Sequence, residues 1–392
     1  MTIERYLTKA IVKDLKKKMV FLGGPRQVGK TTCSNYTAKS HFPSFTYFNW
    51  DNRDHRKDIL NSRWPTDSRL IILDEIHKYT RWKSFVKGEY DIHKERCNFF
   101  ITGSARLDVY KKGGDSLLGR YHYYRLHSFS YAELLKLIPS SEPFKELSFR
   151  EVTSKGIDIY NRLYNFGGFP EPYLEADETV LRRWRNERKH LLFKEDVRDL
   201  SQVRDLSSME IMVDLLPMKV GSLLSVNSLS GDLEVTHKSV NHWLGIMEAL
   251  YYCFRIYPFA HRNIRSLKKE PKLYLWDWTE IEDRGARLEN LVACHLLKFC
   301  HFYYDALGYR LDLRFLRDQQ KRELDFLVTV DNKPWFAVEV KSKDLKLSTP
   351  ALYFKDKLNI PFVYQVVENT EKDFEEKGIR VISLKKFLGA LI

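Results

Sequence analysis

The chain has 392 residues, of which 43% are hydrophobic and 14% aromatic, so a disordered chain is excluded and two or three packed domains are expected. Its 65 Lys and Arg residues outnumber 52 acidic ones, and the net charge of +13 favours a polyanionic partner such as DNA, with solubility as the plainer explanation. Five cysteines without a C-x-x-C pair argue against a disulfide framework, and no run has the length of a signal-peptide core or a membrane span, so a cytoplasmic protein without membrane contact is expected.

The first third of the chain alternates short apolar runs with helical patterns, which is typical of a parallel α/β sheet covered on both faces. The apolar runs lie at residues 19–22, 45–48, 70–73 and 98–102. The first run leads into a segment that fits the phosphate-binding pattern G-x-x-x-x-G-K-[ST], namely Gly24, Pro25, Arg26, Gln27, Val28, Gly29, Lys30 and Thr31, followed by Thr32. In such a loop the backbone binds the phosphates of ATP, Lys30 reaches the β- and γ-phosphates, and Thr31 holds Mg²⁺. The alternative is a chance match in a surface loop.

Two carboxylates, Asp74 and Glu75, directly follow the third apolar run. Downstream of a phosphate loop this is the second landmark of a P-loop NTPase: Asp74 accepts a water bound to Mg²⁺, and Glu75 polarises the attacking water. The fourth run ends near Ser104, which either senses the γ-phosphate or caps the next helix. Arg120 closes a glycine-rich segment. It either neutralises charge during phosphoryl transfer, in its own chain or across an oligomer interface, or is an ordinary surface arginine.

The middle of the chain is predicted to be mainly helical. Residues 182–194 form a helical pattern with a basic run, Arg182, Arg183, Arg185, Arg188 and Lys189, which is either a solvated helix face or a contact for a phosphate backbone. Three helical patterns and aromatic strands follow between 207 and 260, an order that fits a winged helix-turn-helix. Its second helix starts at Thr236 and presents Lys238, Asn241 and His242 to a DNA groove, unless the module only packs the other domains together.

The last part of the chain is predicted to hold an apolar helix at 288–299 and strands near 311–316, 324–330 and 335–340. Asp325 lies at the start of one strand, and Glu339 and Lys341 end the next. This spacing fits the nuclease pattern D…(D/E)-x-K, in which acidic side chains converge on a divalent metal ion and the lysine lies near the attacking water. Glu289, on the helix, is a further candidate ligand. The alternative is an inactive nuclease-like scaffold in which Glu339 and Lys341 form only a salt bridge.

Short motifs follow one another over nearly the whole chain: GGPRQVGKTT, FNWD, LIILDEIHK, ITGSARL, LLGR, FSYAE, GGFPE, EDVRDL, PKLY and GARLEN. In this order of motifs the chain resembles the prokaryotic AAA-type ATPases whose C-terminal half is the domain of unknown function DUF4143. The resemblance implies ATP binding and hydrolysis. One departure is His77, where such proteins often carry glutamine after the acidic pair, and this difference bears on the rate of hydrolysis and not on nucleotide binding.

The expected fold class is α/β, in four parts. They are a P-loop AAA-type ATPase domain with a parallel sheet at 1–138, a helical connector at 139–206, a winged helix-turn-helix at 207–280 and a restriction-endonuclease-like DUF4143 domain at 281–392. The expected function is Mg²⁺-dependent ATP hydrolysis that is coupled to a DNA-related C-terminal module. The alternative is a nucleotide-gated regulator that binds DNA or a protein through an inactive nuclease-like scaffold.

Overall fold

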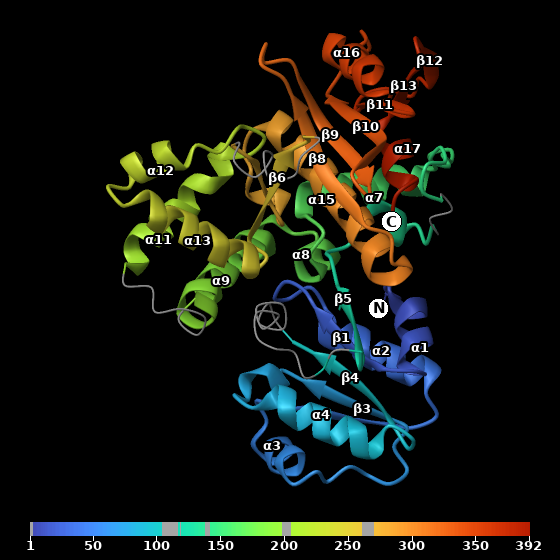
Figure 1. The fold of residues 1–392 in the computed structure, drawn as a ribbon, viewed down its shortest axis with the longest axis vertical. Coiled ribbons are helices and arrows are strands. Elements are labelled where there is room, and N and C mark those ends of the chain that lie inside the picture. Colours follow the sequence, from blue (N-terminus) through green and yellow to red (C-terminus); the bar gives the residue numbers. More distant parts are fainter. Residues whose placement is uncertain (1–2, 104–116, 118, 138–141, 198–204, 261–269) are drawn as a thin grey trace. The chain divides into compact units, whose positions relative to one another are not determined.

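In the computed structural model the chain divides into two compact units (Figure 1). The structure describes residues 3–103, 117, 119–137, 142–197, 205–260 and 270–392. The N-terminal unit consists of Met1–Ser128 with Ala249–Tyr251, and the C-terminal unit of Phe129–Glu248 with Tyr252–Ile392. Each unit is built around a sheet of its own.

The sheet of the N-terminal unit has five parallel strands in the order β2-β3-β4-β1-β5. They are β1 (Met19–Gly23), β2 (Phe45–Asn49), β3 (Leu70–Asp74), β4 (Asn98–Thr102) and β5 (Tyr121–Arg125). The four strands predicted from apolar runs are confirmed as β1 to β4. The fifth was not predicted, because an edge strand with the sequence YHYYR lacks the apolar run of a central one.

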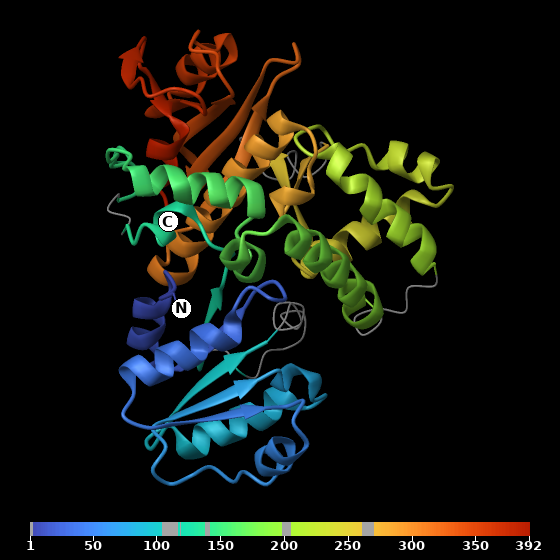
Figure 2. The same ribbon diagram turned by 180° about the vertical axis from the view of Figure 1, so that it is seen from behind.

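Helices cover both faces of this sheet. They are α1 (Thr8–Leu15), α2 (Lys30–His41), α3 (Arg53–Leu60), the short 3-10 helix η1 (Ile76–Lys78) and α4 (Trp82–His93). Helix α4 lies in front of the sheet in Figure 1, and α2 lies in front of it in Figure 2, the view from behind. On the α4 side, Trp82 and Val86 share a buried cluster with Phe21, Ile71 and Ile101. The N-terminal unit is therefore a helix–sheet–helix α/β domain, as predicted.

The C-terminal unit contains an eight-stranded sheet in the order β12-β13-β11-β10-β9-β8-β6-β7. Its strands are β6 (Cys253–Pro258), β7 (Lys272–Leu275), β8 (Leu311–Arg317), β9 (Glu323–Val330), β10 (Lys333–Lys341), β11 (Phe362–Val367), β12 (Phe374–Glu376) and β13 (Ile379–Ser383). The sheet is mixed, because β8, β9 and β10 pair antiparallel whereas β10, β11 and β13 pair parallel. The predicted strands near 311–316, 324–330 and 335–340 are confirmed as β8, β9 and β10.

Some helices of the C-terminal unit cover this second sheet and others lie to one side of it (Figures 1 and 2). In the described ranges they are α6 (Tyr131–Leu134), α7 (Ser154–Phe166), α8 (Pro170–Glu175), α9 (Glu178–Leu191), η3 (Leu192–Val197), α11 (Leu206–Leu215), η4 (Leu216–Lys219), α12 (Val226–Asp232), α13 (His237–Ala249), η5 (Trp278–Glu280), α15 (Arg284–Leu307), α16 (Thr349–Leu358) and α17 (Leu384–Gly389). Phe299 of α15 packs on Phe336, and Phe354 of α16 shares a cluster with Ala337. Since successive strand residues face opposite sides, α15 and α16 cover opposite faces. None of these described helices has the length and hydropathy needed to cross a bilayer.

The segment that follows β5 belongs to the C-terminal unit, which begins at Phe129, whereas the sequence assigns residues up to 138 to the ATPase domain. The backbone N–H of Tyr131 donates to Nε2 of His295 on α15 at 3.1 Å. Nδ1 of His295 lies 2.8 Å from the Leu291 carbonyl, to which it donates. Burial lowers the pKa of His295 to about 4, so the ring is neutral and acts as both acceptor and donor.

A buried ion pair fixes the same segment to α15. Nζ of Lys298 lies 2.6 Å from the Glu133 carboxylate and 2.8 Å from the Ser130 hydroxyl. The side chains of Lys298 and Glu133 are both only 2% exposed. Two residues of the FSYAE motif therefore hold the chain against the longest helix of the C-terminal unit.

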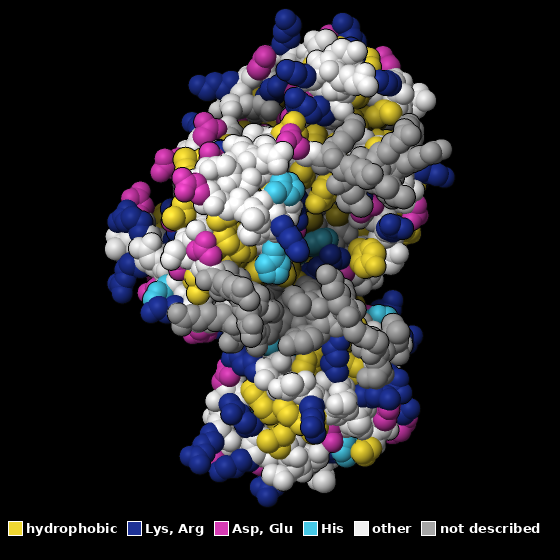
Figure 3. All heavy atoms as spheres, turned by 60° about the vertical axis from the view of Figure 1, so that its left-hand side comes forward, with side chains coloured by type: hydrophobic (Ala, Val, Ile, Leu, Met, Phe, Trp, Pro, Cys, Tyr) yellow, Lys and Arg dark blue, Asp and Glu magenta, His cyan; other side chains and the backbone are white. Residues whose placement is uncertain are grey.

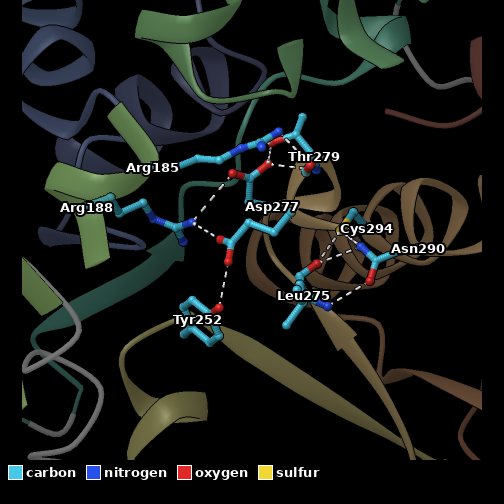
Figure 4. A network of polar contacts seen from close by, with 9 residues as sticks. Arg185, Arg188, Tyr252, Leu275, Asp277, Thr279, Asn290 and Cys294 are labelled. Atoms are coloured by element: carbon cyan, nitrogen blue, oxygen red, sulfur yellow. Dashed lines mark hydrogen bonds and ion pairs between the residues drawn. The ribbon is translucent and has the colours of Figure 1, made fainter. Parts of the chain in front are cut away.

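Part of the basic run on α9 is used inside the unit, as Figure 4 shows. Arg185 donates to the backbone carbonyl of Thr279 at 2.5 Å, and Arg188 pairs with Glu280 at 3.3 Å. Arg182, by contrast, is exposed. These two arginines of the run are thus structural cations, which weakens the interpretation of the whole run as a contact for nucleic acid.

The predicted helices between 207 and 250 are confirmed as α11, α12 and α13, and the Thr236 hydroxyl accepts from the backbone N–H of Ser239 at 3.1 Å. The strands after them differ from the prediction. Strands β6 and β7 pair with each other, but β6 also pairs with β8, so the hairpin forms the edge of the eight-stranded sheet. The expected boundary at residue 280 passes through this sheet, and a separate winged helix stays a prediction.

Candidate functional site

The phosphate-loop segment connects β1 to α2, at the carboxyl edge of the parallel sheet. Gly24 has a φ of 145° and Gly29, directly before α2, a φ of 90°, backbone conformations that favour glycine. A Cβ on Gly24 would lie 2.4 Å from the carbonyl oxygen of Leu126. The two glycines of the motif are therefore required by the shape of the loop, at the edge where open α/β sheets bind ligands.

The other loop residues complete this turn. The Val28 carbonyl accepts from the guanidinium of Arg5 at 2.9 Å, and both residues are buried. Pro25 is buried, Arg26 and Gln27 are half-buried, and Thr31 and Thr32 are exposed in the first turn of α2. This hydrogen bond from Arg5 therefore fixes the Val28 carbonyl of the loop.

Lys30 is the first residue of α2, and its side chain folds back over the loop. Its Nζ donates to the carbonyl oxygen of Pro25 at 2.8 Å and to that of Gly24 at 3.1 Å. Lys30 is only 8% exposed, so the ammonium lies inside the curve of the loop. An ammonium group can exchange carbonyl acceptors for phosphate oxygens while its helix stays in place. This position is consistent with the predicted role of Lys30.

Asp74, at the end of β3, accepts hydrogen bonds from hydroxyl groups of three other elements. Thr31 Oγ1 and the phenol of Tyr47 both donate to its Oδ2, each at 2.7 Å. The Thr102 hydroxyl donates to its Oδ1. Burial and the Asp74 carboxylate raise the pKa of Tyr47, so the phenol stays protonated. Sequence analysis missed Tyr47 and Thr102, although both lie near the carboxyl ends of strands beside β3, where their hydroxyls meet Asp74.

Glu75 follows with a left-handed backbone, φ 58°, and its N–H donates to the Thr102 carbonyl at 3.0 Å. Its Oε2 lies 3.5 Å from Nζ of Lys78 and 3.6 Å from Nε2 of His77. Burial raises the pKa of Glu75, although the ammonium groups of Lys30 and Lys78 oppose the increase. A carboxylate with a raised pKa is suited to accept a proton from water.

The two remaining predicted catalytic residues are Ser104 and Arg120. Ser104 lies outside the described residues. The Arg120 carbonyl accepts from the Met19 N–H at the amino end of β1, and its guanidinium pairs with Asp91 at 2.9 Å. A five-residue strand spans roughly 15 Å, so Arg120 does not reach the loop of its own chain. A role for Arg120 across an oligomer interface stays a prediction.

In the C-terminal unit the neighbouring strands β9 and β10 bring together three of the four residues of the predicted nuclease site. Asp325 accepts from the backbone N–H of Val340 at 2.9 Å. Lys341 pairs with Glu339 at 2.7 Å, and the Ser348 hydroxyl donates to the same Glu339 oxygen at 3.1 Å. Burial raises the pKa of both carboxyl groups. The salt bridge expected for an inactive scaffold is present.

Glu289, the fourth predicted residue, lies on α15 beside a lysine that sequence analysis missed. Nζ of Lys272 on β7 is 3.1 Å from Glu289, and the Tyr274 phenol donates to the same carboxylate at 2.6 Å. Burial and the neighbouring Asp325 raise the pKa of Glu289 to about 7. Within the described ranges no three Asp, Glu, His or Cys side chains are grouped so as to hold a metal ion. The expected four-residue metal site stays a prediction.

The residues predicted to face a DNA groove lie on α13. Lys238 and His242 are exposed, whereas Asn241 is half-buried and donates to the His237 carbonyl at 3.2 Å. On the face drawn in Figure 3, the described Lys and Arg side chains are interspersed with acidic, histidine and apolar ones. DNA contact by α13 stays a prediction.

Comparison with known proteins places the chain among relatives without an assigned activity. The uncharacterized protein MJ1544 of Methanocaldococcus jannaschii is 23% identical over 420 residues, which cover 96% of this chain and 89% of the relative. The uncharacterized protein Rv2008c of Mycobacterium tuberculosis is 25% identical over 351 residues, which cover 85% and 71%. Among solved structures, the RuvB Holliday junction branch migration motor of Thermotoga maritima shows 14% identity and a TM-score of 0.30, over 68% of this chain and 96% of its own.

Three family models match consecutive parts of the chain. They are an AAA domain at residues 16–135, a domain of unknown function (DUF8612) at 157–279 and a domain of unknown function (DUF4143) at 284–387. The first match contains the five-stranded sheet with its phosphate loop, and the third contains α15 and the strands from β8 to β13. The chain therefore carries a match to the AAA domain in its N-terminal part and a match to the DUF4143 domain in its C-terminal part.

Proposed function

We propose that the N-terminal unit binds and hydrolyses ATP. The observation that carries this proposal is the 2.7 Å contact between Thr31 Oγ1 and Asp74 Oδ2, which joins the phosphate loop to the end of β3. In P-loop NTPases these two positions act on the same magnesium ion. Lys30 and Glu75 are the sequence neighbours of this pair, and the Lys30 charge opposes the rise in the Glu75 pKa that burial causes. Phosphate-binding and proton-accepting groups thus share one site.

The residues at the site fit Mg²⁺, which prefers oxygen ligands and is commonly held by one or two protein groups together with phosphates and water. The hydroxyl of Thr31 and the carboxylate of Asp74 would hold it, since they already lie within hydrogen-bond distance of each other. When bound, the ion neutralises charge on the β- and γ-phosphates. Lys30 then binds the same phosphates, and Glu75 accepts a proton from the attacking water.

The proposal predicts that Lys30→Ala lowers the affinity for ATP about 10- to 100-fold, because a hydrogen bond to a charged group contributes about 1.5–3 kcal/mol. Titration with ATP, followed by calorimetry, measures the change. Lys39→Ala is the matched control, since Lys39 is exposed in the last turn of the same helix. An unchanged affinity in the Lys30 variant would show that the proposed site is wrong.

Tyr47→Phe is predicted to raise the Mg²⁺ concentration at half-maximal ATP hydrolysis about 2- to 10-fold, because a neutral hydrogen bond contributes about 0.5–1.5 kcal/mol. The phenol fixes the Asp74 oxygen that Thr31 also contacts, so its loss loosens the carboxylate. Mg²⁺-dependent binding of ATP, measured without turnover, should shift in the same direction. The same change at Tyr36, which lies on α2, is the control. A lower Mg²⁺ requirement in Tyr47→Phe would contradict this role.

For the C-terminal unit we propose a nucleotide-gated module that binds DNA or a protein and does not cleave nucleic acid. The supporting observation is that lysine side chains pair with the acidic residues of the predicted nuclease site. Incubation of DNA and RNA with the protein and Mg²⁺ or Mn²⁺ should leave every substrate intact. Cleavage that disappears in Lys341→Ala would instead establish the nuclease hypothesis. Binding to DNA should weaken with salt and change with ATP.

A further inference from the structure

Lys272 of β7 is surrounded by carboxylates from other elements of the C-terminal unit. Its Nζ lies 2.7 Å from Glu323, 3.1 Å from Glu289 and 3.8 Å from Asp325. Helix α15 carries Glu289, and β9 carries the other two acids. The lysine side chain is only 2% exposed, so the ammonium is a buried partner shared by three acids from two elements.

Two further cations offset part of the remaining charge of this acidic cluster, which we define as Glu289, Glu323, Asp325 and Glu339. Arg317 of β8 pairs with Glu323, and Lys341 pairs with Glu339. The cluster of four carboxylates therefore faces three cationic side chains, Lys272, Lys341 and Arg317. Burial lowers the pKa of Lys272, but the surrounding carboxylates raise it by a larger amount. The net shift of the pKa is therefore upward. The ammonium is thus charged at neutral pH.

A divalent ion does not fit beside this ammonium. Carboxylate oxygens bind Mg²⁺ or Ca²⁺ at about 2.0–2.6 Å, so an ion held by Glu289 and Asp325 would lie next to the positive charge of Lys272. The described acids also form no group that could hold a metal ion. We infer that Lys272 takes the place of a divalent cation in the C-terminal unit, so that Glu289, Glu323 and Asp325 share an ammonium group and not a metal ion.

The inference is tested by Mn²⁺ binding to the full chain, measured by electron paramagnetic resonance without nucleotide. An Asp74→Asn background removes the metal ligand of the proposed ATP site. This background is expected to bind no Mn²⁺ at the acidic cluster. Lys272→Ala in the same background should gain one Mn²⁺ site, and adding Asp325→Asn should abolish it. Lys341→Ala is the matched control and should gain none, because Lys272 stays in place.

Two results would overturn the inference. One is Mn²⁺ binding by the background protein that weakens at least tenfold when Asp325→Asn is added, because the cluster would then be a metal site with Lys272 present. The other is a folded Lys272→Ala variant that gains no Mn²⁺. If Lys272→Ala does not fold, the test uses only the Asp74→Asn protein and its Asp325→Asn derivative. The absence of bound Mn²⁺ from both proteins supports the inference. The outcome is independent of ATP binding by the N-terminal unit, so the two proposals fail separately.

Discussion

Glu75→Gln is expected to lower the turnover number of ATP hydrolysis about 10²- to 10⁴-fold, because the amide keeps the size of the carboxylate but cannot accept a proton from water. The affinity for ATP should stay nearly unchanged, since the phosphate-binding contacts belong to the loop and Lys30. Release of phosphate at saturating ATP and Mg²⁺ measures the first quantity, and titration with nucleotide the second. Equal rates for the variant and the wild type would exclude Glu75 as the base.

The dependence of the rate on pH provides a second readout for the same residue. Glu75 must be ionised to accept a proton, and burial raises its pKa. The rate should therefore fall on acidification, and the fall should begin at a higher pH than an ordinary glutamate would give. Glu75→Gln should lack this part of the profile. Glu95→Gln makes the same chemical change at an exposed position and should behave like the wild type.

Lys298→Met is expected to lower the free energy of unfolding of the C-terminal unit by about 3–5 kcal/mol, because it leaves the buried Glu133 carboxylate without its ammonium partner. Both side chains are 2% exposed and lie 2.6 Å apart, so water does not replace the lost cation. Such a loss is a large fraction of the stability of a typical domain. Denaturation by urea, followed by tryptophan fluorescence, measures the change.

Two further variants distinguish the loss of this ion pair from the general effect of replacing a cationic side chain with methionine. Lys298→Met combined with Glu133→Leu removes both charges and should recover much of the stability, as is common when a buried pair is replaced by apolar residues. Arg182→Met removes a cation from an exposed pair with Glu178 on α9 and should cost at most about 0.5 kcal/mol. A loss below about 1 kcal/mol in Lys298→Met would contradict the importance of the buried pair.

The fold and site of the N-terminal unit can be predicted from the sequence where each motif occupies only a few consecutive residues. The loop from Gly24 to Thr31 and the Asp74-Glu75 pair each occupy a few consecutive residues, and the strands before them are continuous apolar runs. Their contact across the sheet follows once the strands are parallel, because carboxyl ends then share one edge. Tyr47 could not be assigned this way, because the half-buried positions of β2 give no signal that its phenol reaches Asp74.

The C-terminal unit was less predictable because its charged cluster depends on pairing between distant segments. Asp325, Glu339 and Lys341 lie on adjacent strands, so their spacing in the sequence is informative. Lys272 contacts acids on α15 and β9, and no periodic pattern links it to them. The edge hairpin of β6 and β7 was assigned to a separate module for the same reason, since sequence alone does not show which sheet a strand joins.

Leu126 connects the first glycines of the phosphate loop to the backbone that leads into the C-terminal unit. Its N–H donates to the Gly23 carbonyl at 2.9 Å, and its own carbonyl occupies the space where a side chain on Gly24 would lie. The C-terminal unit begins at Phe129, only a few bonds further along the polypeptide. Gly23 and Gly24 thus contact a residue that lies just before the start of the C-terminal unit in the sequence.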